Sequence, residues 1–186
     1  ALGVRYAFVA ELLPTADASG ATCVRTIALW ADGKQGETMN YDLAGTPCAD
    51  VVKQQTCFYP REVQCLFPAD KLLAEMGVES YLGAPLRAAD GTTLGLLVVM
   101  HDQPIDETLQ PLALLQIFAG HAAAELERMR NEQALRAGEE RYRIITDSVP
   151  GLIGYVDREE RYQFVNAAYE QWFGLSRTQI VGRTIR

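Results

Sequence analysis

The stretch that most constrains this chain runs from Arg128 to Arg143. Half of its positions carry a charged side chain, yet it contains no proline and a single glycine. Helical periodicity continues on both sides of it, so the pattern predicts one helix over residues 108–147. A helix of about 40 residues would be about 60 Å long, several times the thickness of a small domain's core. The chain therefore cannot fold as one compact domain around this helix.

The charge pattern of the helix predicts that it is exposed to solvent. Glu132 precedes Arg136, and Glu139 precedes Arg143, each by four positions. An acid placed four residues before a base stabilises an isolated helix by about 0.2–0.5 kcal/mol. These pairs favour a helix that is stable without a surrounding core.

Beyond the first turns of this helix, its apolar face thins to a narrow seam. Its members are Leu126, Met129, Leu135, Tyr142 and Ile145. The heptad spacing is broken between Met129 and Leu135, and the seam is too narrow for a globular core but suits pairing with one second copy. We therefore interpret residues 128–147 as a coiled-coil linker and expect a homodimer through the 108–147 helix. A lone exposed helix is the alternative.

The residues before the helix predict strands. Residues 4–12 and 23–31 alternate between the two faces of a strand, and the turn-forming residues 13–22 between them favour a hairpin. Residues 80–86 and 93–100 predict a second hairpin. The two runs imply an antiparallel sheet.

Local signals place turns and short helices around these strands. Asp90-Gly91 supplies the positive φ that a tight turn of the second hairpin needs. Pro47 suits the first position of a helix, and Gly77 suits a helix end. We therefore predict an α+β fold, in which helices flank an antiparallel sheet and a long linker helix follows.

The residues after the long helix predict the beginning of another domain. They contain two short strands, an acidic turn at Asp157–Glu160, and a short helix from Asn166. About 40 residues with two strands bury too little surface to fold alone. The predicted domains are 1–127, 128–147 (the linker) and 148–186 (a truncated α+β segment).

Composition excludes several classes of function. The net charge is −7, and the 17 Lys and Arg residues are scattered among 24 Asp and Glu residues, which argues against a nucleic-acid partner. No apolar run approaches the roughly 20 residues that cross a bilayer, and no signal peptide is evident. We expect a cytoplasmic protein with no membrane contact by this fragment. Because the chain starts with Ala1, we expect it to be a piece of a longer protein.

Two segments of the chain resemble known families. Residues 1–127 resemble a GAF domain, most clearly in "GTPC", "CFYP" and "YLGAPL" with the following "LGLLVV". Residues from "EERYR" onward are similar to the N-terminal part of a PAS domain, in which Asn166 matches the asparagine that opens the first helix after two strands. The order GAF, helix, PAS is typical of bacterial sensor histidine kinases and cyclic-di-GMP (GGDEF/EAL) proteins.

The chain also departs from these families. Only "ALG" is left of the helix that usually precedes the first GAF strand, and the last three PAS strands are missing, so any PAS cofactor ligands would lie beyond Arg186. Neither a cyclic-nucleotide signature nor the Cys-His pair that attaches a bilin is present. The resemblance therefore leaves the signal and the cofactor unidentified.

The resemblance to GAF domains implies where a ligand would bind. In that family a small molecule lies between the sheet and the short helices on one face, which corresponds here to residues 40–81. The polar residues there that could line such a cavity are Tyr41, Cys57, Tyr59, Gln64, Asp70 and Tyr81. The alternative is that they cap helices and fill the core without any ligand. We assign no catalytic and no metal-binding residue.

Two functions from different classes follow. The first is a sensory and dimerisation module, without enzyme activity of its own, that passes a small-molecule or partner signal through the helix to an absent effector domain. The effector of the parent protein would be a histidine kinase, a diguanylate cyclase or a phosphodiesterase. The second is a thiol-based redox enzyme or redox sensor using Cys48, Cys57 or Cys65, which needs a thiolate of low pKa.

Overall fold

The computed structural model describes residues 3–13, 23–53, 56–106, 108 and 110–185. The chain divides into two compact units, Ala1–Arg128 (unit 1) and Met129–Arg186 (unit 2). Each unit is described by itself. Residues 14–22, which make up nearly all of the predicted first turn, lie outside the described residues.

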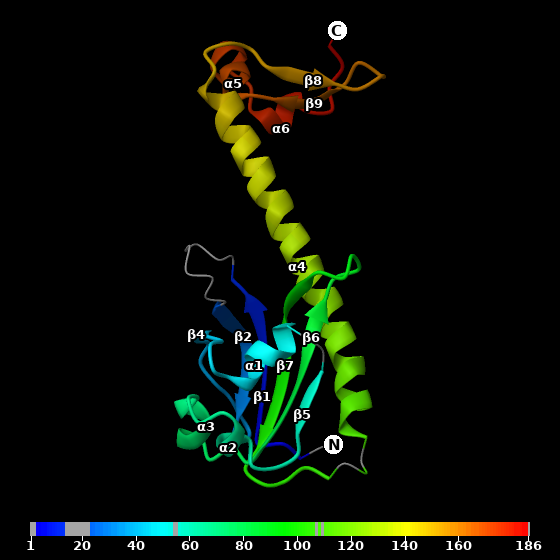
Figure 1. Ribbon diagram of the computed structural model, residues 1–186. Coiled ribbons are helices and arrows are strands. Elements are labelled where there is room, and N and C mark those ends of the chain that lie inside the picture. Colours follow the sequence, from blue (N-terminus) through cyan, green and yellow to red (C-terminus); the bar gives the residue numbers. More distant parts are fainter. Residues whose placement is uncertain (1–2, 14–22, 54–55, 107, 109, 186) are drawn as a thin grey trace. The chain divides into compact units, whose positions relative to one another are not determined.

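Unit 1 is built on one antiparallel sheet (Figure 1). Along the sheet the order is β3-β2-β1-β7-β6-β5, and β4 also pairs with β2. The strands are β1 (Tyr6–Leu12), β2 (Cys23–Ala31), β3 (Lys34–Gln35), β4 (Asn40–Asp42), β5 (Cys57–Tyr59), β6 (Ser80–Arg87) and β7 (Thr93–His101). The antiparallel sheet predicted from the sequence is confirmed, with β3 and β5 as additional short strands at its edges.

Turn chemistry determines how β6 and β7 are joined. Gly91 has φ +88°, a conformation that costs glycine little. Its amide donates to the Ala88 carbonyl, and Asp90 Oδ1 accepts from the Thr92 amide. The Asp90-Gly91 turn predicted from the sequence is therefore present.

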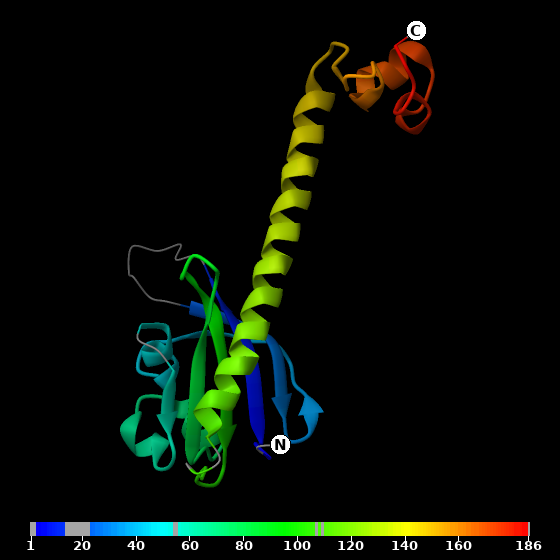
Figure 2. The ribbon, with the colours of Figure 1, turned by 90° about the vertical axis from the view of Figure 1, so that its right-hand side faces the viewer.

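Helices cover both faces of this sheet (Figure 2). The short helices are α1 (Pro47–Lys53), α2 (Val63–Leu66) and α3 (Lys71–Glu75). On one face, α1 and α3 enclose a core with β1, β6 and β7, in which Val51 and Leu73 are buried. On the other face, Leu115, Ala119 and Leu126 of the long helix α4 pack into a second core. Because both faces are covered, β6 and β7 are apolar on both sides.

Helix α4 spans Pro111–Ser148, 38 residues without interruption. The long helix is confirmed, but it begins at Pro111 rather than at Thr108. Gln110 has φ +48°, outside the helical region, and proline is favoured at the first helical position. Only some of the exposed charged side chains of α4 form the ion pairs that the sequence predicts.

One of the two predicted ion pairs in α4 is present. Arg136 Nη2 lies 2.5 Å from Glu132 Oε1. Arg143 Nη2 instead lies 4.0 Å from Oε1 of Glu140, three residues earlier, and does not pair with Glu139. Residues three or four positions apart lie on the same face of a helix, so pairing with Glu140 instead of Glu139 costs little free energy.

Unit 2 contains the end of α4 and a small α+β arrangement. Its remaining elements are β8 (Gly154–Val156), β9 (Tyr162–Val165), α5 (Ala167–Phe173) and α6 (Arg177–Ile180). The strands β8 and β9 form an antiparallel pair. The rings of Tyr142 on α4 and Phe164 on β9 lie 5.2 Å apart.

Asn166 is the polar centre of unit 2. Its side chain is fully buried. It donates to the carbonyls of Thr146 (2.9 Å) and Gly151 (2.8 Å) and accepts from the Ile153 amide (3.0 Å). Asn166 does precede α5 as predicted, but its side chain joins α4 to the following loop instead of capping the helix. Within the described residues, no helix is long and apolar enough to span a bilayer.

Candidate functional site

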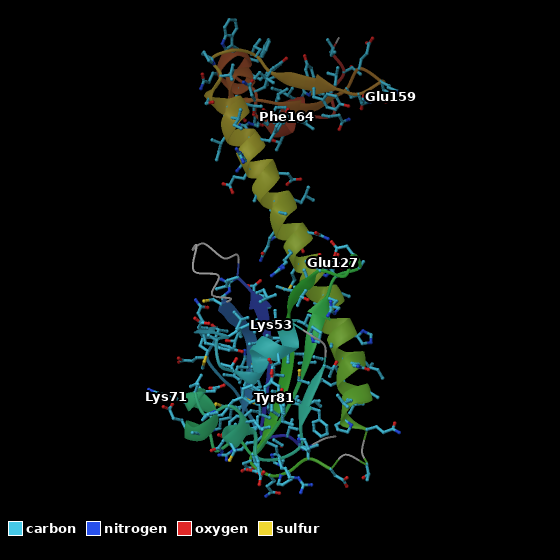
Figure 3. The ribbon with its side chains drawn as sticks, in the orientation of Figure 1. Lys53, Lys71, Tyr81, Glu127, Glu159 and Phe164 are labelled. Atoms are coloured by element: carbon cyan, nitrogen blue, oxygen red, sulfur yellow. The ribbon has the colours of Figure 1, made fainter. Side chains whose placement is uncertain are left out.

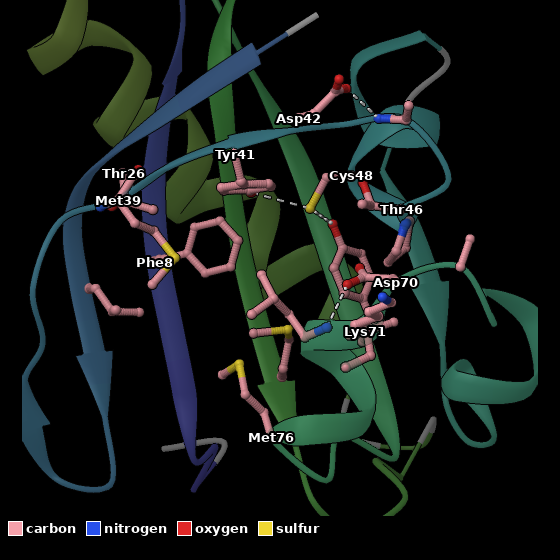
Figure 4. A pocket seen from close by; sticks show the side chains of 18 residues that line it. Phe8, Thr26, Met39, Tyr41, Asp42, Thr46, Cys48, Asp70, Lys71 and Met76 are labelled. Carbon is pink, nitrogen blue, oxygen red and sulfur yellow. Dashed lines mark hydrogen bonds between the residues drawn. The ribbon is translucent and has the colours of Figure 1, made fainter.

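Unit 1 contains a cavity of about 290 Å³ between the sheet and its short helices (Figure 4). Its wall is formed by β1, β2, β4, β6 and β7, by the start of α1, and by α3 with the residues on both sides of it. The volume lies at the lower end of the range for small-molecule sites. The cavity can therefore hold one small organic molecule.

Most of the wall is apolar. Phe8, Leu29, Met39, Met76 and Met100 supply much of it. Phe8 meets the ring of Tyr41 edge to face, with centroids 6.2 Å apart. Thioether side chains adapt easily to the shape of a ligand, so this wall suits an apolar body of variable outline.

A buried polar cluster forms one part of the cavity wall. The hydroxyl of Tyr81 donates to Cys48 Sγ at 3.2 Å, and the hydroxyl of Tyr41 donates to the same sulfur at 3.5 Å. Burial raises the pKa of Cys48 to about 11, although these two hydrogen bonds act in the opposite direction. Burial likewise raises the pKa of both tyrosines. All three groups are therefore neutral at pH 7.

The backbone of β6 makes room for this cluster. A Cβ atom at Gly83 would lie 2.6 Å from the Tyr81 hydroxyl and 2.6 Å from Val51 Cγ2. Glycine within a strand often marks such a close approach. The glycine of the "YLGAPL" motif thus allows the Tyr81 side chain to reach Cys48.

Asp70 is the half-buried carboxylate of the cavity. It is the N-cap residue of α3, and its Oδ1 accepts from the Leu72 amide at 3.2 Å. Burial raises its pKa, while hydrogen bonds from the α3 backbone partly oppose this shift. Lys71, the next residue, is exposed. Figure 3 shows Lys71 at the edge of unit 1 and Tyr81 within it.

The structure brings together three of the six predicted site residues. Tyr41, Asp70 and Tyr81 line the cavity. Their role in binding a ligand stays a prediction.

The other three predicted residues do not line this cavity and have structural contacts. The Tyr59 hydroxyl donates to Asp50 Oδ2 at 3.1 Å, and Gln64 Nε2 donates to the Val78 carbonyl at 2.8 Å. Cys57 lies on β5, where it pairs with Gly83. These residues fit the alternative that polar side chains in this region support the fold.

Sequence reasoning missed much of the cavity wall. Phe8, Thr26 and Met100 lie far from residues 40–81 in sequence, and the sheet brings them together. Cys48 was expected to be either a buried free thiol or a reactive one and was not among the predicted site residues, whereas it lines the cavity and accepts hydrogen bonds from two tyrosines. The "GTPC" motif was the signal that could have placed it in the site.

The thiols do not support the redox alternative. Cys48 and Cys57 both have a raised pKa, chiefly through burial. Thiol catalysis needs the opposite, a lowered pKa at an accessible sulfur. All four cysteines are free, and Cys65 is the exposed one. No group of three His, Cys, Asp or Glu side chains that could hold a metal ion occurs within the described residues.

We expect Cys65 to react with Ellman's reagent first and Cys48 last in the native protein. With a pKa of about 11, Cys48 is only about one part in a thousand thiolate at pH 8, and it is buried. Raising the pH increases its thiolate fraction. C65S should remove the fast phase of labelling, and C48S should leave that fast phase unchanged. Equal labelling rates for both thiols in native protein would contradict this assignment.

Comparisons with known proteins agree with this architecture. The GAF domain family model matches residues 1–126, and the PAS fold family model matches residues 146–186. No curated protein matches the chain.

Solved structures show the same fold. The GAF domain of a two-component sensor histidine kinase from Bacillus halodurans is 20% identical, with a TM-score of 0.52 over 70% of this chain and 86% of that one. The A. aeolicus nlh2 GAF domain in an inactive state is 12% identical, with a TM-score of 0.50 over 69% of this chain and 76% of that one. The predicted fold class, with its GAF-like sheet and PAS-like segment, is confirmed. The chain belongs to the GAF domain family through residues 1–126, and its residues 146–186 match the PAS fold.

Proposed function

We propose that this chain is a sensory and dimerisation module of a cytoplasmic, multidomain signal-transduction protein. Unit 1 binds a small molecule, and α4 passes the change to an effector domain outside this chain. The fragment itself has no enzyme activity. The observation that carries this proposal is the apolar cavity of unit 1, which shares two strands with the core under α4.

The strands β6 and β7 provide a physical route from the cavity to α4 within unit 1. Tyr81 and Met100 line the cavity, while their neighbours Leu82 and Val99 belong to the core with α4. Successive side chains of a strand point to opposite faces of the sheet. A ligand that displaces Tyr81 or Met100 would therefore shift the strands on which α4 packs.

The first solved structure above comes from a two-component sensor histidine kinase, which supports a kinase as effector of the parent protein. A diguanylate cyclase or phosphodiesterase is the other effector class that the order of domains favours. The output of the full-length protein, phosphotransfer or cyclic-di-GMP turnover, distinguishes the two.

The later part of α4 supports pairing with a second copy. Leu126 of the predicted seam is buried in the core of unit 1, whereas Leu135, Tyr142 and Ile145 of that seam are more than half exposed. Burying them against the same residues of another α4 would form a two-helix seam. The proposed partner is therefore an identical chain.

Inserting two alanines after Ala134 in the full-length protein should change its output strongly. Two residues rotate the following helix by about 200°, which moves the apolar seam to the opposite side. Duplicating residues 128–134 is the matched control, because seven residues nearly restore the phase of the helix. The signal-dependent change in effector activity is measured for both. Unchanged output after the two-residue insertion would refute transmission through α4.

A further inference from the structure

The cavity offers hydrogen-bond acceptors and very few donors, which restricts what it can bind. The hydroxyl protons of Tyr41 and Tyr81 are both donated to Cys48 Sγ, so these hydroxyl groups have no proton left to donate to a ligand and could only accept. The hydroxyl of Thr46 donates to the Leu43 carbonyl. Thr26 Oγ1 both donates to and accepts from the backbone of Met39. A ligand must therefore bring its own donor.

Charge adds a second restriction. Asp42, Asp70 and Lys71 are the charged side chains of the wall, so its net charge is negative. Asp42 and Lys71 are exposed, whereas Asp70 is half-buried. A charge in the water-accessible rim is screened, and a charge inside the cavity acts more strongly on a ligand.

Asp70 forms no ion pair with any residue that the structure describes. Within the described part of the chain, no Lys, Arg or His side chain forms an ion pair with it, and Lys71 beside it is exposed. Its carboxylate still has acceptor capacity after the bond from the Leu72 amide. Removing a carboxylate from water is costly unless a positive group or hydrogen-bond donor compensates. A bound cation would supply this compensation.

We propose that the cavity binds a small organic ammonium ion with an apolar body, its ammonium group at Asp70 and its body against the methionines and Phe8. The net negative charge of the wall and its few hydrogen-bond donors disfavour anions such as nucleotides and carboxylic acids. This inference rests on the proposed ligand-binding function of the cavity and names the chemical class of the ligand.

Three probes of similar body and different head group test the proposal: 2-phenylethylamine, 2-phenylethanol and 3-phenylpropanoate. Titration calorimetry with the whole chain should show the amine binding about tenfold or more tightly than the alcohol, since charge-assisted hydrogen bonds are the stronger ones. The carboxylate should bind most weakly. In the same titrations, the methyl NMR signals of the cavity methionines Met39, Met76 and Met100 should shift.

The variant D70N isolates the charge. Asparagine also caps helices well, so the start of α3 is retained. D70N should reduce the affinity for the amine to that for the alcohol and leave the alcohol unchanged. D90N is the matched control, because Asp90 also accepts from the amide two residues later but lies in the β6–β7 turn.

Three results would overturn the proposal. They are a carboxylate that binds as well as the amine, an amine affinity that D70N leaves intact, and no binding of any probe at millimolar concentration. None of these decides whether the module transmits a signal through α4. The insertion after Ala134 tests that function separately, because its outcome does not depend on the class of ligand.

Discussion

Replacing Gly95 by alanine is expected to lower the free energy of unfolding of unit 1 by about 3 kcal/mol or more. Gly95 lies on β7 between Glu11 on β1 and Leu86 on β6. A Cβ atom there would overlap the carbonyl oxygen of Ala10 and lie 3.0 Å from Glu11 Cα. These are backbone atoms of a central strand, so no side chain can move aside to relieve the overlap. The two strands would have to separate.

Urea unfolding followed by circular dichroism measures this effect. G120A is the matched control, because Gly120 lies on α4 and an added Cβ atom meets nothing within 4 Å. Alanine there should stabilise the helix by about 0.5–1 kcal/mol. The same glycine-to-alanine change is thus expected to lower stability at one position and to raise it at the other. A G95A protein as stable as the unsubstituted chain would show that β1 and β7 do not approach this closely.

Replacing Asn166 by alanine is expected to destabilise unit 2 by about 3–5 kcal/mol. The substitution removes three hydrogen bonds at once. It leaves the Thr146 and Gly151 carbonyls and the Ile153 amide without their partner in a site where Asn166 is fully buried. Buried polar groups without a partner cost more than the hydrogen bonds themselves contribute. The contact between the end of α4 and the start of α5 should therefore loosen.

Hydrogen exchange reports this loss locally. The Ile153 amide and the amides of α5 should exchange much faster in N166A, while the amides of β6 and β7 in unit 1 provide an internal reference. Q163A is the control, because Gln163 makes an exposed hydrogen bond to Asp157 and its loss should cost well under 1 kcal/mol. Equal protection of the Ile153 amide in N166A and the unsubstituted chain would show that Asn166 does not hold this junction together.

Local signals in the sequence predicted much of the fold. The alternation in β1 and β2, the Asp90-Gly91 turn and the long polar helix all depend on neighbouring residues, whose preferences can be read directly. The start of α4 was placed at residue 108 instead of Pro111, because helical periodicity does not define the end of a helix to within a few residues. The short elements β5, α2 and α6 were not predicted as such, because three or four residues carry too little periodicity to recognise.

The candidate site was predicted only in part. The resemblance to GAF domains located the region of the cavity, and polar character then selected six residues within it. Tyr59 and Gln64 are polar and lie in that region, yet they donate to Asp50 and Val78 instead of lining the cavity. Polarity alone does not distinguish a residue that faces a ligand from one that supports the backbone.

The sequence by itself determined that a polar helix of about ten turns leaves the first domain, because charge and periodicity along one segment are sufficient to specify it. It also determined the strands and the turn between β6 and β7. Only the tertiary structure decided that Phe8, Cys48, Asp70 and Met100 share one cavity. The physical reason is that a cavity wall consists of residues distant in sequence, and strand pairing brings them together. No local preference encodes that proximity.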